Sequence, residues 1–382
     1  MECIIKGKIR IKALRQYNTM TKPPDKIGLI LISIFALFQC LNAQESVPEK
    51  DLRFFVLPIV YYTPETSWAL GGATVFTFQL GEQDSLTKPS QVQFGAAYTL
   101  RSQFLAYLPF QLIFPNDRYR FFGELGYYKY NYFFYGIGNG YEAYDGEIYD
   151  VNFPRVRLNF QRKLANHFYG GLRYWLDDFN ITGLEEGGLL ATRDIAGKGG
   201  SLLSAGGLIF TYDNRDQLFY TRRGRYIEAG WLANTSLLGG NFTFDKFTLD
   251  ARQFFPLGEK AALGINAYAE LTFGNPSFNQ LALLGGPKRL RGYLEGRYRD
   301  NHYLMLQAEY RFPLFWRLGG VVFGGTGAVA DQLDRFAGEY WRYAAGVGMR
   351  LTLIPKDNIN LRVDYGIGQN SSGFYLTIGE AF

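Results

Sequence analysis

The sequence predicts an all-β protein that crosses a membrane as an antiparallel β-barrel of about 16 strands. Three observations support this fold: a composition rich in Tyr, Phe and Gly, strands with one apolar and one polar face, and an N-terminus typical of exported proteins. Of the 382 residues, 17% are aromatic and 20% are charged, whereas roughly 25% are charged in ordinary soluble domains. Because helix-forming residues accumulate in no long window, the composition favours β-structure.

Alternation with a period of two is the first sign of individual strands. In residues 359–367, large apolar side chains alternate with Asn360, Arg362 and Asp364. Such strands, about 9 to 12 residues long, suit a tilted bilayer crossing, although alternation also occurs in soluble β-sandwiches. The same pattern recurs in residues 155–161, 263–273 and 304–312.

Aromatic residues crowd the predicted strand ends in residues 54–62 and 127–135, where the rings would lie at the two membrane interfaces. With about 340 residues after export and roughly 21 for each strand with its connection, 16 strands fit, and 14 is the nearest alternative. The end of the chain predicts a terminal aromatic strand, as in outer-membrane barrels. Its apolar side chains in one phase are Phe374, Leu376, Ile378 and Phe382.

Residues 1–43 are predicted to be a cleaved secretory signal peptide. Seven cations precede the apolar run Ile27–Phe38, and the small residue Ala43 follows at a suitable cleavage position. The run is shorter than the roughly 20 residues of a spanning helix, so a retained anchor is the weaker alternative. Met20 is an alternative translation start, because it gives a signal peptide of more ordinary length.

The predicted signal peptide contains both cysteines, Cys3 and Cys40, so the exported barrel of residues 44–382 would carry neither. A lipoprotein attached through Cys40 is an alternative, but Gln39 is bulky where a small residue is expected. Removing seven cations and two acids from the 40 basic and 35 acidic residues leaves 33 of each. A nearly neutral chain gives no support to nucleic-acid binding.

A charged stretch with five cations and two acids interrupts the apolar pattern at residues 281–300. Because predicted strands lie on both sides, residues 287–301 are predicted to be a loop. On an exposed loop these charges would be a solvated patch. Alternatively, the loop folds into a polar lumen, where Arg291 could reach an inward carboxylate and Gly292 would allow a backbone turn closed to other residues.

Residues 283–300, LLGGPKRLRGYLEGRYRD, resemble the inward-folded loop of the BamA/TamA family, the bacterial surface antigen superfamily of outer-membrane β-barrels. The family's Asp-x-Arg-Asp stretch is matched by Asp213, Arg215 and Asp216. The similarity covers most of residues 205–382 and is only general before them. Further similar segments are residues 306–314, 321–331 and 375–382.

The resemblance implies a bacterial outer-membrane barrel whose loop carries an Arg-Gly-aromatic tip, here Arg291, Gly292 and Tyr293. It also implies that the loop arginine pairs with an acid on the next strand, and Glu309 is the matching position. In a water-filled pore such a pair would contribute little to stability. The family has a further aspartate where this chain has Gly325. Two other acids could support the pair instead: Asp331 and Asp364.

Family members that insert or secrete proteins carry periplasmic POTRA domains before the barrel. Here only residues 44–50, QESVPEK, separate Ala43 from the first predicted strand. The sequence therefore predicts a barrel without these domains. Capture and delivery of a client would then depend on a separate periplasmic chaperone or delivery protein, or be absent.

In the family, the seam between the first and last strands can part to pair with an incoming strand. Pro58 removes a ladder donor from the first strand, Gly379 removes packing near the end of the last, and Phe382 lies just beyond it. An ordinary strand start is the alternative explanation of Pro58. We expect a barrel, surrounded by outer-membrane lipid, that assists insertion or translocation of unfolded outer-membrane proteins. The alternative is a passive pore or transport barrel plugged by the loop.

The sequence predicts no enzyme, metal site or cofactor. His167 and His302 are the only histidines, and they show neither metal-ligand spacing nor a nearby serine signature. The neighbouring Glu185 and Glu186 are better explained as a solvated loop than as an acid/base pair. Glycine-rich segments such as GGTG precede no helix, so phosphate binding is not supported.

Overall fold

The computed structural model describes residues 52–80, 89–336, 338–355 and 358–382. The predicted signal peptide, its two cysteines and the alternative start at Met20 lie outside the described residues. No helix in the described part of the chain is long and apolar enough to cross a membrane.

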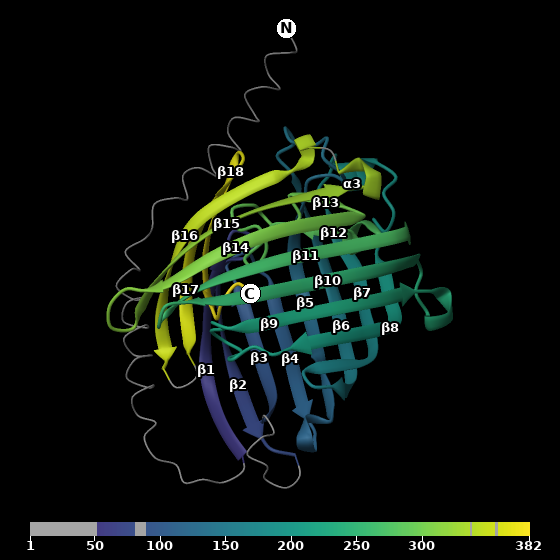
Figure 1. The fold of residues 1–382 in the computed structure, drawn as a ribbon. Coiled ribbons are helices and arrows are strands. Elements are labelled where there is room, and N and C mark those ends of the chain that lie inside the picture. Colours follow the sequence, from purple (N-terminus) through teal and green to yellow (C-terminus); the bar gives the residue numbers. More distant parts are fainter. Residues whose placement is uncertain (1–51, 81–88, 337, 356–357) are drawn as a thin grey trace. The chain divides into compact units, whose positions relative to one another are not determined.

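Sixteen antiparallel strands close into one barrel, in which each strand pairs with the next and the first meets the last (Figure 1). The predicted number of strands is confirmed, and the 14-strand alternative is wrong. The barrel strands are β1 (Leu52–Thr63), β2 (Ser67–Phe78), β3 (Ser90–Thr99), β4 (Phe104–Ile113), β5 (Tyr119–Phe134), β6 (Glu147–Ala165), β7 (Phe168–Leu184), β8 (Ser201–Asp213), β9 (Gly224–Asn234), β10 (Thr243–Leu257), β11 (Ala261–Asn275), β14 (His302–Pro313), β15 (Leu318–Ala330), β16 (Arg342–Ile354), β17 (Ile359–Gly368) and β18 (Ser371–Ile378).

Helical structure in the described residues is confined to short turns in the connections. The only α-helix among them, α3, has four residues. These elements are η1 (Pro115–Asp117), α3 (Leu189–Thr192), η2 (Ser236–Leu238), η3 (Phe278–Gln280), η4 (Leu333–Arg335) and η5 (Gly338–Tyr340).

The strands place apolar side chains outside the barrel and polar ones inside, as predicted. On β17 the outward Tyr365 and Ile367 are 46% and 56% exposed, whereas the inward Arg362 and Asp364 are 2% and 0% exposed. Closure lets each strand satisfy the backbone groups of its neighbours, which β-structure requires in hydrocarbon. The junction between β1 and β18, described below, is the exception.

Eight barrel strands exceed the predicted length of about 9 to 12 residues, and the longest of them are β5, β6 and β7. β5, β6 and β7 have 16, 19 and 17 residues. Their additional length carries an aromatic cluster inside the barrel, where the rings of Phe153 and Phe179 stack with centroids 4.3 Å apart. Tyr128 and Phe134 of the aromatic stretch 127–135 belong to this cluster. The prediction that this stretch lies only at the membrane interfaces is therefore wrong for its inward rings.

The two ends of the barrel differ in the lengths of their connections. Residues 135–146, 185–200 and 276–301 connect strands at one end, called the long-loop end below. Residues 166–167 and 258–260 connect strands at the other, the short-turn end.

The charged stretch is organised differently from the prediction of a strand end followed by a plain loop. β11 ends at Asn275, and the connection to β14 contains its own hairpin, in which β12 (Ala282–Leu284) pairs with β13 (Tyr298–Asp300). Strands of three residues are too short to show a period of two, so the sequence pattern could not reveal them.

Candidate functional site

The connection between β11 and β14, residues 276–301, is called the lumen loop. β12 and β13 form its stem, and residues 285–297 form its tip. The Gly286 N–H donates to the Tyr293 carbonyl oxygen (3.0 Å), which closes the tip. The tip contacts inward side chains of β14 and β17, so it lies inside the barrel rather than on an exposed loop.

Arg291 binds two acids from different strands. Its guanidinium donates from Nη2 to Glu309 Oε2 of β14 (2.5 Å) and from Nη1 to Asp364 Oδ2 of β17. The three side chains are 0% exposed. The guanidinium also lies 3.6 Å from the centroid of the Phe323 ring on β15. The family-implied pair of Arg291 and Glu309 is therefore present, with Asp364 as a second acid.

Further arginines surround the same two acids. Arg311 Nε donates to Glu309 Oε1 (2.7 Å), and Arg350 Nη1 donates to Asp364 Oδ1 (2.6 Å). The premise of a water-filled pore is wrong for this site, because these side chains are buried and no water screens their charges. What the pair contributes to stability stays a prediction. We call this group the arginine–acid network. Its members are Arg291, Arg311, Arg350, Arg362, Glu309, Asp364 and Glu380.

The two acids considered as substitutes for the family's missing aspartate have different positions. Asp364 contacts Arg291 directly. Asp331 lies at the long-loop end, where it pairs with Arg335 (2.7 Å) and is largely exposed to solvent. Asp364 alone of these two therefore supports the lumen loop.

The loop tip fits closely against β17 because glycines line the contact. Gly292 has φ +120°, and a Cβ on it would lie 2.9 Å from the Ile367 carbonyl carbon. A Cβ on Gly366 would lie 2.6 Å from the Arg291 carbonyl oxygen, and one on Gly368 would lie 2.5 Å from the Tyr293 ring. Gly366 and Gly368 are called the glycine cradle. Sequence reasoning identified Gly292 but missed the cradle.

Tyrosines fix the tip to the last strands. The Gly292 N–H donates to the Tyr375 hydroxyl of β18 (3.1 Å). The Tyr293 hydroxyl donates to the Tyr343 carbonyl oxygen (3.0 Å) and accepts from the Gln369 N–H (2.7 Å). The tip therefore contacts β14, β16, β17 and β18, on one side of the junction between the last and first strands.

The other side of that junction is also attached to the lumen loop. The Glu295 N–H donates to Glu65 Oε1 (2.8 Å) in the turn between β1 and β2. The Glu295 residue is exposed at the loop tip, although protein surrounds it. Burial and the neighbouring Glu65 carboxylate raise the pKa of Glu295 to about 7, against the opposing effect of Arg289, Lys288 and Arg299.

The stability of the folded protein is expected to fall as the pH rises through the pKa of the Glu295 carboxyl. A raised carboxyl pKa favours the protonated form in the folded state, so its contribution is complete below the ordinary value near 4.5 and is lost by about pH 7. The thermal unfolding midpoint of Glu295→Gln should therefore lose this part of the pH dependence. Glu186→Gln, in the exposed loop between β7 and β8, is the control and should follow the unmodified protein. Parallel curves for Glu295→Gln and the unmodified protein between pH 5 and pH 8 would contradict this assignment.

β1 and β18 pair at a single position among the described residues, where Tyr62 lies opposite Leu376. By contrast, β1 pairs with β2 along its whole length, from Leu52 to Thr63. We call the junction of β1 and β18 the seam. In the antiparallel register of Tyr62 and Leu376, residues 52–59 of β1 extend beyond the end of β18. Pro58 lies in this segment and is exposed.

The end of the chain leaves the barrel wall, which corrects the prediction for Phe382. β18 ends at Ile378, and Gly379 with φ +88° turns the chain. Phe382 then packs inside the barrel against Phe254, and its carbonyl oxygen accepts from Arg311 Nη2 (2.8 Å). Phe382 is therefore a lumen residue and not part of the seam. The one-phase pattern failed because it could not show where the strand stops.

The residues of the Asp-x-Arg-Asp stretch lie away from the lumen loop, whereas His302 begins β14 directly after it. Asp213 and Arg215 form a bidentate ion pair at the short-turn end. In the connection between β8 and β9, Asp216 accepts a hydrogen bond from the Arg222 backbone N–H. His302 is buried and contacts the Phe273 ring. Across residues 52–80, 89–336, 338–355 and 358–382, no group of three or more His, Cys, Asp and Glu could hold a metal ion.

Comparisons with known proteins identify the fold. BamA from Haemophilus ducreyi lacking POTRA domains 1–3 superposes with a TM-score of 0.58 and 12% identity, over 87% of this chain and 70% of that structure. CdiB from Acinetobacter baumannii gives 0.56 and 14%, over 86% and 60%. CdiB from Escherichia coli gives 0.53 and 13%, over 87% and 64%. The chain thus spans less than two thirds of the length of either CdiB structure.

No curated protein matches the sequence. The model of the Omp85 superfamily domain matches residues 61–382, which is nearly the whole described barrel. Together with the closed barrel, this match shows that the chain belongs to the Omp85 superfamily and is a protein of the bacterial outer membrane.

Proposed function

We propose that this protein assists the insertion or translocation of outer-membrane proteins, using the seam as an edge for an incoming strand. The observation that supports the proposal best is the sparse pairing of β1 with β18 beside fully paired neighbouring strands. A strand edge with free N–H and C=O groups can pair with an extended segment of another chain. Membership of the Omp85 superfamily supports the same role.

The lumen loop would control how far the seam opens. It is attached to β18 through Tyr375 and to the first hairpin through Glu65. Opening the seam separates these two attachments, so at least one of them must break or the loop must move. The arginine–acid network anchors the loop on the side of the last strands, which makes the contact with Glu65 the weaker of the two.

The proposal requires no catalytic residue or cofactor. Its partners would be unfolded outer-membrane proteins as clients, outer-membrane lipid, and a separate periplasmic chaperone or delivery protein. The periplasmic protein that copurifies with the barrel would identify the delivery partner.

Locking the seam is expected to abolish the proposed activity. Tyr62→Cys with Leu376→Cys, in a chain whose Cys3 and Cys40 are replaced by serine, places two thiols at the paired position of β1 and β18. The rate at which an unfolded barrel protein inserts into liposomes should rise with the reduced protein and return to the protein-free rate after oxidation. Tyr62→Cys with Trp68→Cys is the control, because it cross-links β1 to β2 and leaves the seam free.

Conductance across planar bilayers tests the alternative function. Steady ion conductance without any acceleration of insertion would favour a passive pore or transport barrel plugged by the lumen loop, and would overturn the proposed role. Equal inhibition by both cross-links would show that the seam is not the active edge.

A further inference from the structure

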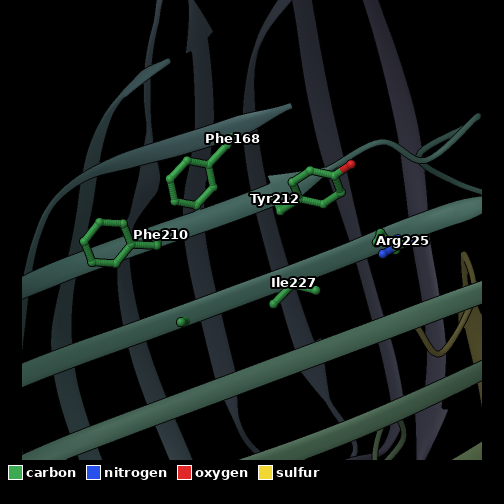
Figure 2. Close-up of a pocket in the computed structure, with 6 residues that line it drawn as sticks. Phe168, Phe210, Tyr212, Arg225 and Ile227 are labelled. Carbon is green, nitrogen blue, oxygen red and sulfur yellow. The ribbon is translucent and has the colours of Figure 1, made fainter. Parts of the chain in front are cut away.

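A groove on the outer wall of the barrel has no role in the proposed function. It has a volume of about 360 Å³ and lies across β7, β8 and β9 near the short-turn end (Figure 2). This volume is within the range of small-molecule pockets, roughly 300–1,000 Å³. Its lining residues are Phe168, Phe210, Tyr212, Arg225, Ile227 and Ala229.

The groove faces the lipid. Phe210 and Ile227 are 40% and 38% exposed on the outward phase of β8 and β9, whereas the neighbouring Ile209 is buried inside. The rings of Phe168 and Phe210 lie nearly parallel, with an interplanar angle of 10° and centroids 6.3 Å apart. These apolar walls fit a hydrocarbon chain.

One end of the groove is polar. Figure 2 shows the Tyr212 hydroxyl and the Arg225 nitrogens at the end opposite Phe210. Arg225 is exposed, and within the described residues its guanidinium has no ion-pair partner. The Tyr212 hydroxyl accepts from Asn214 Nδ2 (3.2 Å), so its own proton remains free to donate to a ligand.

The charge around this end favours an anion. Two acids lie near this end, Asp213 at the end of β8 and Asp216 in the connection to β9. Both are engaged: Asp213 with Arg215, and Asp216 with the backbone N–H groups of Gln217 and Arg222. The cations outnumber the acids, which leaves a net positive charge beside the groove. They are Arg215, Arg222, Arg223 and Arg225.

We propose that this groove binds one phospholipid of the inner leaflet, with an acyl chain along Phe168, Phe210 and Ile227 and the phosphate on Arg225 and the Tyr212 hydroxyl. The short turns of outer-membrane barrels face the periplasm, so this end of the groove lies at the level of the inner-leaflet phosphates. An arginine can donate two charge-assisted hydrogen bonds to a phosphate. The apolar groove and the adjacent cation together match a lipid better than a free anion.

Native mass spectrometry of the purified barrel with added palmitoyl-oleoyl-phosphatidylglycerol tests this site. We expect one lipid to remain bound at activation energies that strip the others. Arg225→Gln should weaken retention about tenfold, the scale of one lost charge-assisted hydrogen bond. Ala229→Phe should also reduce retention, because it fills the groove and leaves Arg225 in place. The unmodified protein should retain diacylglycerol with the same acyl chains no better than the Arg225→Gln variant retains phosphatidylglycerol.

Arg317→Gln is the matched control, because Arg317 is a cation beside the exposed Trp316 in another connection of the short-turn end. Equal losses in Arg225→Gln and Arg317→Gln would show general lipid adhesion and overturn the proposal. Full retention by Ala229→Phe, or equal retention of diacylglycerol and phosphatidylglycerol, would do the same. The folded state of each variant is checked by its resistance to heat on gels.

Discussion

Arg291→Ala is expected to lower the free energy of unfolding by about 3 kcal/mol, near the lower end of the range for breaking a buried ion pair. The change leaves Glu309 and Asp364 buried without the cation between them. The lower end applies because each acid keeps two other arginines. Glu309 keeps Arg311 and Arg350, and Asp364 keeps Arg350 and Arg362. The midpoint of denaturant unfolding in detergent, and the temperature at which the folded band disappears on gels, would both decrease.

Arg335→Ala is the control for this experiment. Arg335 forms an ion pair with Asp331 of similar length, 2.7 Å, but both side chains are largely exposed. Its removal should change the free energy of unfolding by about 0–1 kcal/mol, as for other surface pairs. If Arg291→Ala behaved like Arg335→Ala, the lumen loop would not be anchored by its buried charges.

Gly366→Ala is expected to displace the tip of the lumen loop. The added Cβ would lie 2.6 Å from the Arg291 carbonyl oxygen and 2.8 Å from the Gly292 nitrogen. Both are backbone atoms, so no side-chain rotation can relieve the clash, and such overpacking typically costs about 1–3 kcal/mol. Limited proteolysis should cut the loop tip faster in this variant than in the unmodified protein.

Gly199→Ala provides the comparison, because a Cβ at Gly199 would meet nothing within 4 Å. This variant should keep the protease resistance of the loop tip and the heat resistance of the barrel. Unchanged cleavage in Gly366→Ala would mean that the cradle has room to adjust and does not hold the loop.

Period-two alternation predicted the strands and their two faces. Strand length, aromatic strand ends and the export signal then favoured a membrane barrel, and the chain length gave its number of strands. Alternation assigned Glu309 and Asp364 to the inward phase, because a side chain in a strand has only two directions. The resemblance to a family then connected Arg291 with Glu309. Both inferences use information within one strand or one motif, which a sequence displays directly.

The remaining features depend on contacts between distant residues. Asp364 and Arg291 are 73 positions apart and meet because closure brings β17 beside the loop. In the sequence, the glycine cradle cannot be distinguished from small residues on any other inward strand face. Its role follows only from the position of the loop. The position of Phe382 depends on a turn at Gly379 that interrupts a regular pattern. Alternation also does not indicate how deeply an inward side chain is buried, so it could not show that the arginine–acid network is shielded from water.

The part of β1 that has no partner from β18 has a consequence for the surrounding bilayer. Residues 52–59 would extend over roughly 26 Å at about 3.3 Å per residue, a distance close to the thickness of the hydrocarbon core, about 30 Å. No described residue of β18 pairs with them, and each bare peptide group costs several kcal/mol against acyl chains. The least costly arrangement admits water and disorders the neighbouring lipid tails. The membrane beside β1 is therefore expected to be thinner and wetter than around the rest of the barrel.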